Sequence, residues 1–444
     1  MHINKITMIE ERINMNIRRI FIDGFKNVDN VNINLSKITG LLSINNFGKS
    51  NLLDAFDFAL EFINSNIREK IHMMNVKSCI PVLTKTFGKN FKFEIEFDSM
   101  LGKTDCSVLY GYEFSWNIGP KAGSKIVKEY LKIKTDDTQK YTSYIYRTDK
   151  EAFYKTTLTS RCEKEITVKD CELLVNKLCA YDNLFYIEIL EVLNDFQIYI
   201  DRHFDSENLY KSELFIIKEN NYLSPTADNK IPYILNELKK NHKNQYELIV
   251  NTLKDLFPYI EEIEIKEIDL SGMLTKNQIN NVYPFIYTDF ECIIYVTIKN
   301  AQKKIQFVNM SDGVKRLLSI LTYISLAELS NIPLIAIEEP ENSIHPGLFK
   351  RYLITLNAFI KKSKIIITSH SPYLINFMNL SNIYIGVPND GGTAKFRKIK
   401  DNAVSKINNH AESMDMMVGD YLFDLMSGYD EYDIQNLKKY LEND

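Results

Sequence analysis

The chain has 444 residues, a formal net charge of −4 at neutral pH and a sequence pI near 6.1. With 45% hydrophobic and 25% charged residues it has the composition of an ordinary globular protein with two or three lobes. No apolar run approaches the roughly 20 residues that span a bilayer, and no signal-peptide pattern opens the chain. Six cysteines without CxxC or metal-ligand spacing indicate reduced thiols, so we expect a cytoplasmic protein with no membrane partner.

The acidic balance does not indicate nucleic-acid binding, because nucleic-acid-binding domains are commonly basic. Three short basic clusters occur, at Arg18-Arg19, at Lys239-Lys240 with Lys243, and at Lys361-Lys362 with Lys364. Each is more typical of a solvated face, and a local DNA groove stays open as an alternative.

We expect residues 1–15, which are mostly polar and charged, to form a loose leader. From residue 16 to about residue 150 β patterns dominate. Apolar side chains alternate from Phe91 to Phe97 and from Val108 to Trp116, and further strands are predicted near 128–133 and 144–146.

A phosphate-binding loop is predicted inside this region, at Ser43-Ile44-Asn45-Asn46-Phe47-Gly48-Lys49-Ser50-Asn51. It follows an apolar strand, 38–42, and opens a helix. Backbone N–H groups at a helix start hold phosphates, while Lys49 supplies a charge and Ser50 a ligand for Mg²⁺. The usual pattern has glycine where this chain has Ser43, so the motif alone is equally consistent with an ordinary strand–turn–helix.

Helical periods replace β patterns between residues 151 and 257, at 171–180, 184–195, 231–240 and 246–256. Strands return at 263–268 and 292–298. Ser311-Asp312-Gly313 then precedes a predicted helix, 314–329, and offers a second anion site built from a hydroxyl, a glycine backbone and a helix dipole. In most proteins such a triplet is only a capped turn.

Two later apolar strands end in polar side chains, one at Glu338-Glu339-Pro340 and the other at Ser369-His370. Ligands of open α/β sheets bind outside the carboxyl ends of strands, so Lys49, the paired carboxylates and His370 are expected to converge. An acidic loop is commonly just solvated, and a lone histidine is commonly structural. Four such motifs in this order favour NTP hydrolysis.

The ordered motifs resemble the ABC-type ATPase heads of the RecF, SMC and OLD group. The likeness is greatest to the compact OLD-like or RloA-like AAA-family ATPases of prokaryotic anti-phage defence operons. It covers about residues 16–120 and 260–430, and it includes Lys26-Asn27 after the first strand and a late hairpin at 389–392.

The resemblance implies a role for each motif residue. Glu339 would be the general base, His370 the switch histidine, and Glu338 with Ser50 the Mg²⁺ ligands. Ser311, Asp312, Gly313 and Arg316 would contact the γ-phosphate of ATP held by a partner subunit. The phosphate loop would comprise Asn45, Asn46, Phe47, Gly48, Lys49, Ser50 and Asn51, and residues 342–345 would be the D-loop.

The implied fold class is α/β: an ABC-type ATPase head with a P-loop sheet, an antiparallel β subdomain and an inserted helical lobe. Residues 16–150 and 258–410 would form the two halves of the head, 151–257 the lobe, and 411–444 a helical tail. No sustained heptads indicate coiled-coil arms, and the residues after His370 lack the acidic cluster of a TOPRIM nuclease. Four apolar tail residues, Met414, Met417, Leu422 and Leu425, could face a partner, although packing on the protein's own core is the commoner outcome.

The implied function is that of an ATP- and Mg²⁺-dependent switch. It would form a head-to-tail homodimer or higher even oligomer around ATP, and would control a separately encoded effector, a nuclease or toxin, in anti-phage defence. Two alternatives stay open: a RecF-like repair ATPase that clamps DNA itself, and a nearly inert nucleotide-bound scaffold. The second is suggested by Ser43 and by Glu338, which stands where the family often has aspartate.

Overall fold

The structure is a computed structural model that describes residues 15–44, 47–118, 123–135, 140–181, 183–202, 209–210, 215–217, 231–269, 285–287, 290–387, 391–427 and 431–442. The chain divides into two compact units. The first comprises residues 1–200, 330–339 and 361–444, and the second comprises residues 201–329 and 340–360.

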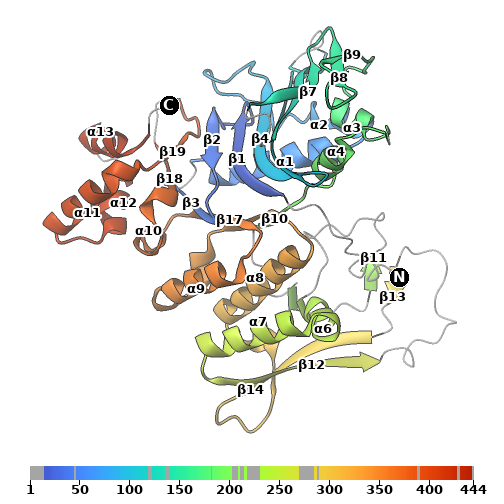
Figure 1. The fold of residues 1–444 in the computed structure, drawn as a ribbon. Helices are drawn as coiled ribbons and strands as arrows, with labels where there is room; N and C mark the ends of the chain where they lie inside the picture. The colour runs from blue at the N-terminus through green and yellow to red at the C-terminus, as the bar shows by residue number, and fades with distance from the viewer. Residues whose placement is uncertain are drawn as a thin grey trace. The chain divides into compact units, whose positions relative to one another are not determined.

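An eight-stranded antiparallel sheet forms one part of the first unit (Figure 1). Its strand order is β2-β1-β4-β5-β6-β7-β8-β9. The bounds are β1 Asn16–Asp23, β2 Val31–Asn34, β4 Phe91–Leu101, β5 Thr104–Phe114, β6 Ile126–Thr135, β7 Thr142–Arg147, β8 Ala152–Lys155 and β9 Cys162–Glu165. The alternating patterns at 91–97 and 108–116 thus correspond to β4 and β5, and their apolar side chains are buried.

Helix α1 (Lys49–Asn64) packs on this sheet through aromatic side chains. The Phe62 ring stacks on Phe114 with centroids 4.7 Å apart, and Phe58 lies edge-on to Phe91 at 5.3 Å. The Tyr112 hydroxyl donates a hydrogen bond of 2.8 Å to the Ala59 carbonyl in the middle of the helix. Because α1 begins at the predicted phosphate loop, this core fixes the direction in which the loop faces.

A six-stranded sheet forms the other part of the first unit, in the order β10-β16-β17-β3-β18-β19. Strands β16, β17, β3 and β18 run parallel, and β19 is antiparallel to β18. The bounds are β3 Ile38–Leu42, β10 Ile198–Asp201, β16 Leu334–Glu338, β17 Lys364–Ser369, β18 Ile383–Gly386 and β19 Phe396–Lys398. The strands are buried almost throughout, as expected for parallel strands covered on both faces.

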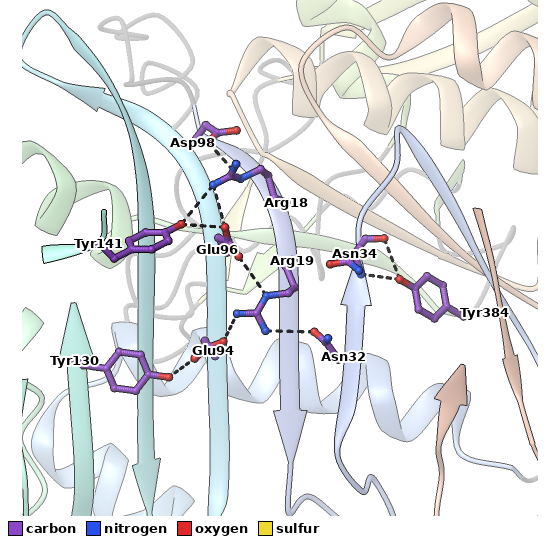
Figure 2. Close-up of polar contacts among 10 residues, drawn as sticks. All are labelled: Arg18, Arg19, Asn32, Asn34, Glu94, Glu96, Asp98, Tyr130, Tyr141 and Tyr384. Carbon is purple, nitrogen blue, oxygen red and sulfur yellow. Dashed lines mark hydrogen bonds and ion pairs between the residues drawn. The ribbon is translucent and has the colours of Figure 1, made fainter. Parts of the chain in front are cut away.

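Figure 2 shows a polar network on the large sheet, around Arg18 and Arg19 of β1. The Arg18 guanidinium is 2.9 Å from Glu96, which also accepts from the Tyr141 hydroxyl at 2.9 Å, and Arg19 pairs with Glu94 and Glu96. The predicted basic cluster at Arg18-Arg19 is therefore matched by carboxylates on the neighbouring strand β4.

The same view shows how the two sheets of the first unit are joined (Figure 2). The Tyr384 hydroxyl of β18 accepts from the Asn34 amide at 2.8 Å and donates to the Asn34 carbonyl at 3.4 Å. Burial raises the pKa of Tyr384 to about 12, so the hydroxyl keeps its proton and can do both.

Smaller helices complete the first unit. Helix α10, between β17 and β18, and the later helices α11, α12 and α13 lie together at the red end of the chain in Figure 1. Their bounds are α10 Pro372–Phe377, α11 Val404–Ser413, α12 Val418–Ser427 and α13 Glu431–Tyr440. Near the large sheet lie α2 Ile67–Met73, α3 Leu174–Leu178 and α4 Ile187–Asn194.

Among its described residues, the second unit combines a small antiparallel sheet with the helices named below. The sheet consists of β12 Ile260–Asp269, β14 Phe290–Ile298 and β15 Ile305–Gln306, and a separate pair consists of β11 Phe215–Ile217 and β13 Phe285–Tyr287. The helices are α6 Ile231–Asn241, α7 Lys243–Leu256, α8 Asp312–Leu329 and α9 Pro346–Phe359. Among the described residues, no helix combines the length and apolar character needed to cross a membrane.

The division of the chain differs from the single helical lobe expected over 151–257. Strands β8 and β9 extend the large sheet, and α3 and α4 bury Leu174 and Leu190 in the same core as α1. Of the described elements in this range, β11, α6 and α7 belong to the second unit, where the Tyr233 hydroxyl of α6 contacts the Phe290 carbonyl of β14. Helical periodicity shows that a helix has an apolar face, but it does not show which core covers that face.

Candidate functional site

The predicted phosphate loop lies between β3 and α1. Asn45 and Asn46 lie outside the described residues. Gly48 stands directly before the helix with φ 114°, and a Cβ there would lie 2.8 Å from the Ala394 Cβ and from the Asn27 Oδ1. The left-handed φ and the close approach both favour glycine at this position. Phe47 packs edge-on to Phe396 with ring centroids 5.6 Å apart.

Asn27 braces this turn from a distant part of the chain. Its side-chain amide donates to the carbonyls of Phe47, at 3.2 Å, and Gly392, at 3.3 Å. Its Oδ1 accepts from the Asn51 side chain at 2.9 Å. The sequence places Asn27 and Gly392 near motifs of the resembled family, but the brace itself could not be predicted, since nothing in the local pattern pairs residues so far apart.

Lys49 is held by three hydrogen bonds within the first unit. Its ammonium donates to the Ser43 carbonyl at 3.2 Å, to the Ser43 hydroxyl at 3.0 Å and to the His370 Nδ1 at 2.9 Å. An ammonium has three N–H donors, so these contacts match its capacity. Ser43, the departure from the usual glycine, is fully buried and supplies two of the three acceptors.

The two predicted carboxylates lie at the end of β16 and face different partners. Glu338 Oε1 accepts a hydrogen bond from the Ser50 hydroxyl at the start of α1. Glu339 has φ 47°, a left-handed conformation that is uncommon outside glycine, and its backbone N–H donates to the Thr368 carbonyl at 2.9 Å. Such backbone strain is concentrated at functional sites, which makes Glu339 a candidate on structural grounds.

His370, just beyond β17, connects Lys49 to Glu339. Its Nε2 lies 2.6 Å from the Glu339 carboxylate, and its Nδ1 lies 2.9 Å from the Lys49 ammonium. Because the ammonium has only hydrogens to offer, Nδ1 accepts and the Nε2–H donates to Glu339. The Ser43 carbonyl lies 3.0 Å from Nδ1 and can only accept, so a hydrogen bond between these two atoms needs a proton on Nδ1, as in the doubly protonated ring.

The arrangement can perform three operations on a phosphate-bearing ligand. The turn and Lys49 can bind negative charge, Ser50 with Glu338 offers hard oxygen ligands of the kind Mg²⁺ prefers, and Glu339 can accept a proton. His370 orients the carboxylate by donating from Nε2. All of these residues lie in the first unit, as the convergence of strand ends predicts.

A pocket of about 490 Å³ opens beside the start of α1. Asn27 and Asn51 form part of its wall, so it adjoins the braced turn. Its size falls within the range of small-molecule sites, and its lining mixes amines with aliphatic side chains. The remaining lining residues are Lys26, Lys77, Ser78, Ile80, Val82, Leu83 and Gly392.

The predicted second anion site lies in the second unit. Ser311 precedes the first residue of α8, Ser311 and Asp312 are exposed, and Asp312 pairs with Lys315 at 2.8 Å. Ser311 and Gly313 line a pocket of about 180 Å³ together with Ile344 and His345 of the predicted D-loop. The structure therefore brings these two motifs together.

Arg316, which the family resemblance assigned to the γ-phosphate of ATP in a partner subunit, is buried. Its side chain is only 4% exposed, and its guanidinium pairs with the buried Asp201 carboxylate at 3.1 Å. The helix α8 is buried over most of its length, and Arg316 falls on its inward face. In this structure Arg316 forms an internal ion pair, which leaves Ser311 and Asp312 as the exposed part of the motif and Gly313 half-buried.

A substitution at Gly386 of β18 tests how tightly the predicted phosphate loop is packed. A Cβ at this position would lie 2.5 Å from Phe47 Cδ1 and 2.7 Å from Ser43 Cβ. Gly386→Ala should displace both ends of the loop and weaken nucleotide binding by about tenfold or more, since overpacking typically costs about 1–3 kcal/mol. Titration with a fluorescent ATP analogue measures this effect.

The matched control is Gly123→Ala, because a Cβ at Gly123 would meet no atom within 4 Å. Equal nucleotide affinity for the two variants, with both correctly folded by circular dichroism, would show that Gly386 does not shape the loop.

Comparison with known proteins gives one family match. Residues 188–376 match the family described as "AAA domain, putative AbiEii toxin, Type IV TA system". A comparison with curated proteins finds no significant sequence match.

Three solved structures similar to this chain are all SMC head domains. An SMC head bound to the C-terminal winged-helix domain of ScpA has a TM-score of 0.45 and 14% identity, and covers 88% of this chain and 99% of its own. The Thermotoga maritima SMC head has a TM-score of 0.40 and 12% identity, and the match covers 87% of this chain and 99% of the SMC head. The third structure is a Pyrococcus furiosus SMC head with an extended coiled coil, bound to the C-terminal domain of ScpA. It has a TM-score of 0.43 and 12% identity, and the match covers 90% of this chain and 100% of the SMC head. These scores are too low to assign a function, whereas the family match supports an ATPase of the ABC/AAA class.

Proposed function

We propose that the protein is an ABC-type ATPase that binds Mg-ATP at the end of β3 and hydrolyses it slowly. The observation that carries this proposal is the convergence of Lys49, Glu339 and His370 within hydrogen-bonding distance of one another. The left-handed conformation of Glu339 and the Ser50–Glu338 contact add support.

The nucleotide would be held by residues already in place. The phosphates would meet the turn around Gly48 and draw the Lys49 ammonium from its contacts with Ser43. Ser50 and Glu338 would hold Mg²⁺, which neutralises phosphate charge when bound; their oxygen atoms fit that ion. The pocket beside Asn51 has room for the base and the sugar.

The proton of the attacking water would pass to a Glu339 carboxylate oxygen. His370 keeps that carboxylate aligned by donating from Nε2, and its Nδ1 faces the lysine that binds phosphate. Phosphate binding and base orientation are therefore linked through one imidazole.

The finer part of the proposal concerns assembly. Ser311, Asp312 and Gly313 would face the nucleotide of a second subunit, which gives a head-to-tail dimer with two composite sites. The exposure of Ser311 and Asp312, and the pocket that Ser311 and Gly313 share with His345, support this arrangement. The closed dimer would control a separately encoded effector, a nuclease or toxin of anti-phage defence. The family resemblance and the toxin–antitoxin description of the matched family support that role.

The alternative of a DNA clamp gains no support from the three basic clusters. Arg18 and Arg19 face Glu94 and Glu96 (Figure 2). Lys240 pairs with Glu267 in the second unit. Lys364 donates to the Leu35 carbonyl at 2.9 Å. Salt-sensitive binding of duplex DNA by the purified protein would reverse this assessment.

Glu339→Gln tests the general base. Loss of a general base costs about 10²–10⁴-fold in rate, so phosphate release should fall by that amount while ATP binding survives. Glu338→Gln is the matched control, because it should weaken Mg²⁺-dependent ATP binding as well. If Glu339→Gln hydrolyses ATP as fast as an active wild-type protein, Glu339 is not the general base. If the wild-type protein itself is as slow as Glu339→Gln, the result favours the inert scaffold.

A mixing experiment tests whether the site is shared between subunits. Lys49→Ala should abolish ATP binding because the phosphate-facing charge is lost, and Ser311→Arg should spare binding but block dimer closure. Mixing the two inactive variants should restore part of the ATPase activity, since one composite site then combines an intact Lys49 with an intact Ser311. An absence of recovery at every mixing ratio would contradict the head-to-tail dimer.

The division of labour between ATPase and effector gives a third expectation. The purified protein should cut neither DNA nor RNA, with Mg²⁺ or Mn²⁺ and with or without ATP. Gel assays on labelled substrates measure this. Cleavage that persists in Lys49→Ala would instead point to a catalytic centre elsewhere in the chain.

A further inference from the structure

Four exposed apolar side chains lie on α10 and on the turn between α11 and α12, two segments that are in contact through Asn376 and Met417. We call this set, Tyr373, Phe377, Met414 and Met417, the methionine surface. Met414 is 59% and Met417 65% exposed, and Tyr373 and Phe377 are 42% and 38% exposed. Asn376, between the two aromatic residues of α10, contacts the Met417 sulfur at 3.5 Å. Leu422 and Leu425, which the sequence grouped with these methionines, are buried in the tail's own core.

The support beneath the methionine surface is fixed by specific contacts. The Gly419 amide donates to the Asn376 side chain at 2.7 Å, and a Cβ at Gly419 would lie 2.2 Å from the Pro372 carbonyl, so α12 sits directly on α10. The Tyr440 hydroxyl of α13 contacts Tyr421 at 2.9 Å and His410 at 2.5 Å, which ties α11, α12 and α13 together. The two methionines are therefore exposed on helices that are themselves held in place by these contacts.

The chain segment that carries the two methionines is rich in acidic residues. Residues 407–437 contain seven acidic residues and no lysine or arginine. Asp420 and Asp424 follow Met417 at spacings of three and seven, which places them on the same helix face. Within the described part of the chain, no ion pair involves the exposed carboxylates of Glu412, Asp415, Asp420 and Asp424.

We propose that the methionine surface binds a basic amphipathic helix of a partner protein. Methionine side chains are unbranched and polarizable, so they adapt to the apolar face of a docking helix. Apolar anchors on one face of the partner helix would cover the methionines and aromatic rings, and its lysines or arginines would meet the acidic rim. An acidic partner would be repelled by the same carboxylates.

The methionine surface is joined to the candidate ATP site through α10. His370 is two residues before Pro372, and Ser371 caps α10 by accepting from the Tyr373 amide at 3.2 Å. Gly419 contacts the Pro372 carbonyl, so a displacement of His370 would reach both Tyr373 and α12. Partner affinity should therefore depend on the nucleotide state; this step rests on the proposed function.

The probe is a fluorescein-labelled 18-residue helix of leucine and lysine at helical spacing, titrated with the full chain by fluorescence anisotropy. A scrambled peptide of the same composition and a glutamate-for-lysine version are its controls. The basic helix should bind, the scrambled peptide at least about tenfold more weakly, and binding should weaken with salt. Equal binding of the scrambled peptide would overturn the proposal.

Two pairs of substitutions test the chemistry of the surface. Met414→Ser with Met417→Ser should weaken binding on the order of tenfold or more, whereas Leu158→Ser, at a site that is 65% exposed elsewhere, should not. Asp420→Lys with Asp424→Lys should transfer binding from the basic helix to the glutamate version. Unchanged affinity in both pairs would refute the assignment. A different outcome is that the chain binds no peptide but associates with itself as its concentration rises. If only the methionine variant loses that self-association, the surface is an interface between copies of this chain instead.

The nucleotide arm separates the two proposals. Peptide affinity is compared in Glu339→Gln saturated with Mg-ATP and in Lys49→Ala, and a coupled surface should show a difference of about fivefold or more. If the wild-type protein hydrolyses ATP but the two variants bind the peptide with equal affinity, the docking surface is retained and its dependence on the nucleotide state is refuted. Undiminished hydrolysis by Glu339→Gln would instead count against the proposed function, with the peptide titrations unaffected.

Discussion

The parallel pairing of β3, β16 and β17 is the constraint on which the candidate site depends. Leu42 at the end of β3 lies opposite Ser369 of β17, and Glu338 of β16 lies opposite Thr368. With this register the residues that follow each strand emerge at the same edge of the sheet. A shift of one residue would turn alternate side chains to the other face, and Lys49, Glu339 and His370 could no longer meet.

The parts of the fold that follow from local pattern could be predicted, including β3 with its turn and α1, the strands β4 and β5, and the strand ends at Glu338 and Ser369. Local pattern could not predict which part of the protein each helix or buried side chain packs against. The helices α3 and α4 were expected in a lobe, but they bury their apolar faces on the large sheet. Leu422 has the same helical spacing as its neighbours, and only tertiary packing decides that it is buried while Met417 is exposed. Arg316 shows the same limit, because its buried partner Asp201 is remote in sequence.

Ser43 illustrates how a departure from a motif can be accommodated. A glycine in its place would leave the Lys49 ammonium without the hydroxyl that accepts at 3.0 Å. The extra side chain is tolerated because Gly386 on the adjacent strand has none. Ser43 and Gly386 are complementary in volume, so the predicted phosphate loop keeps close packing despite its unusual residue. The fit of Ser43 against Gly386 therefore says more about this loop than the missing motif glycine does on its own.

The brace made by Asn27 has a thermodynamic consequence. Asn27 belongs to the first residues of the chain, whereas Gly392 and Ala394 approach the turn from its last quarter, and the turn lies between them. A ligand that binds this turn only when all three segments are assembled stabilises the native state by RT ln(1 + [L]/Kd), about 2.7 kcal/mol at a concentration 100 times Kd. Nucleotide would then act as a non-covalent crosslink between the two ends of the chain, and the melting temperature of the first unit would report its occupancy even where no hydrolysis takes place.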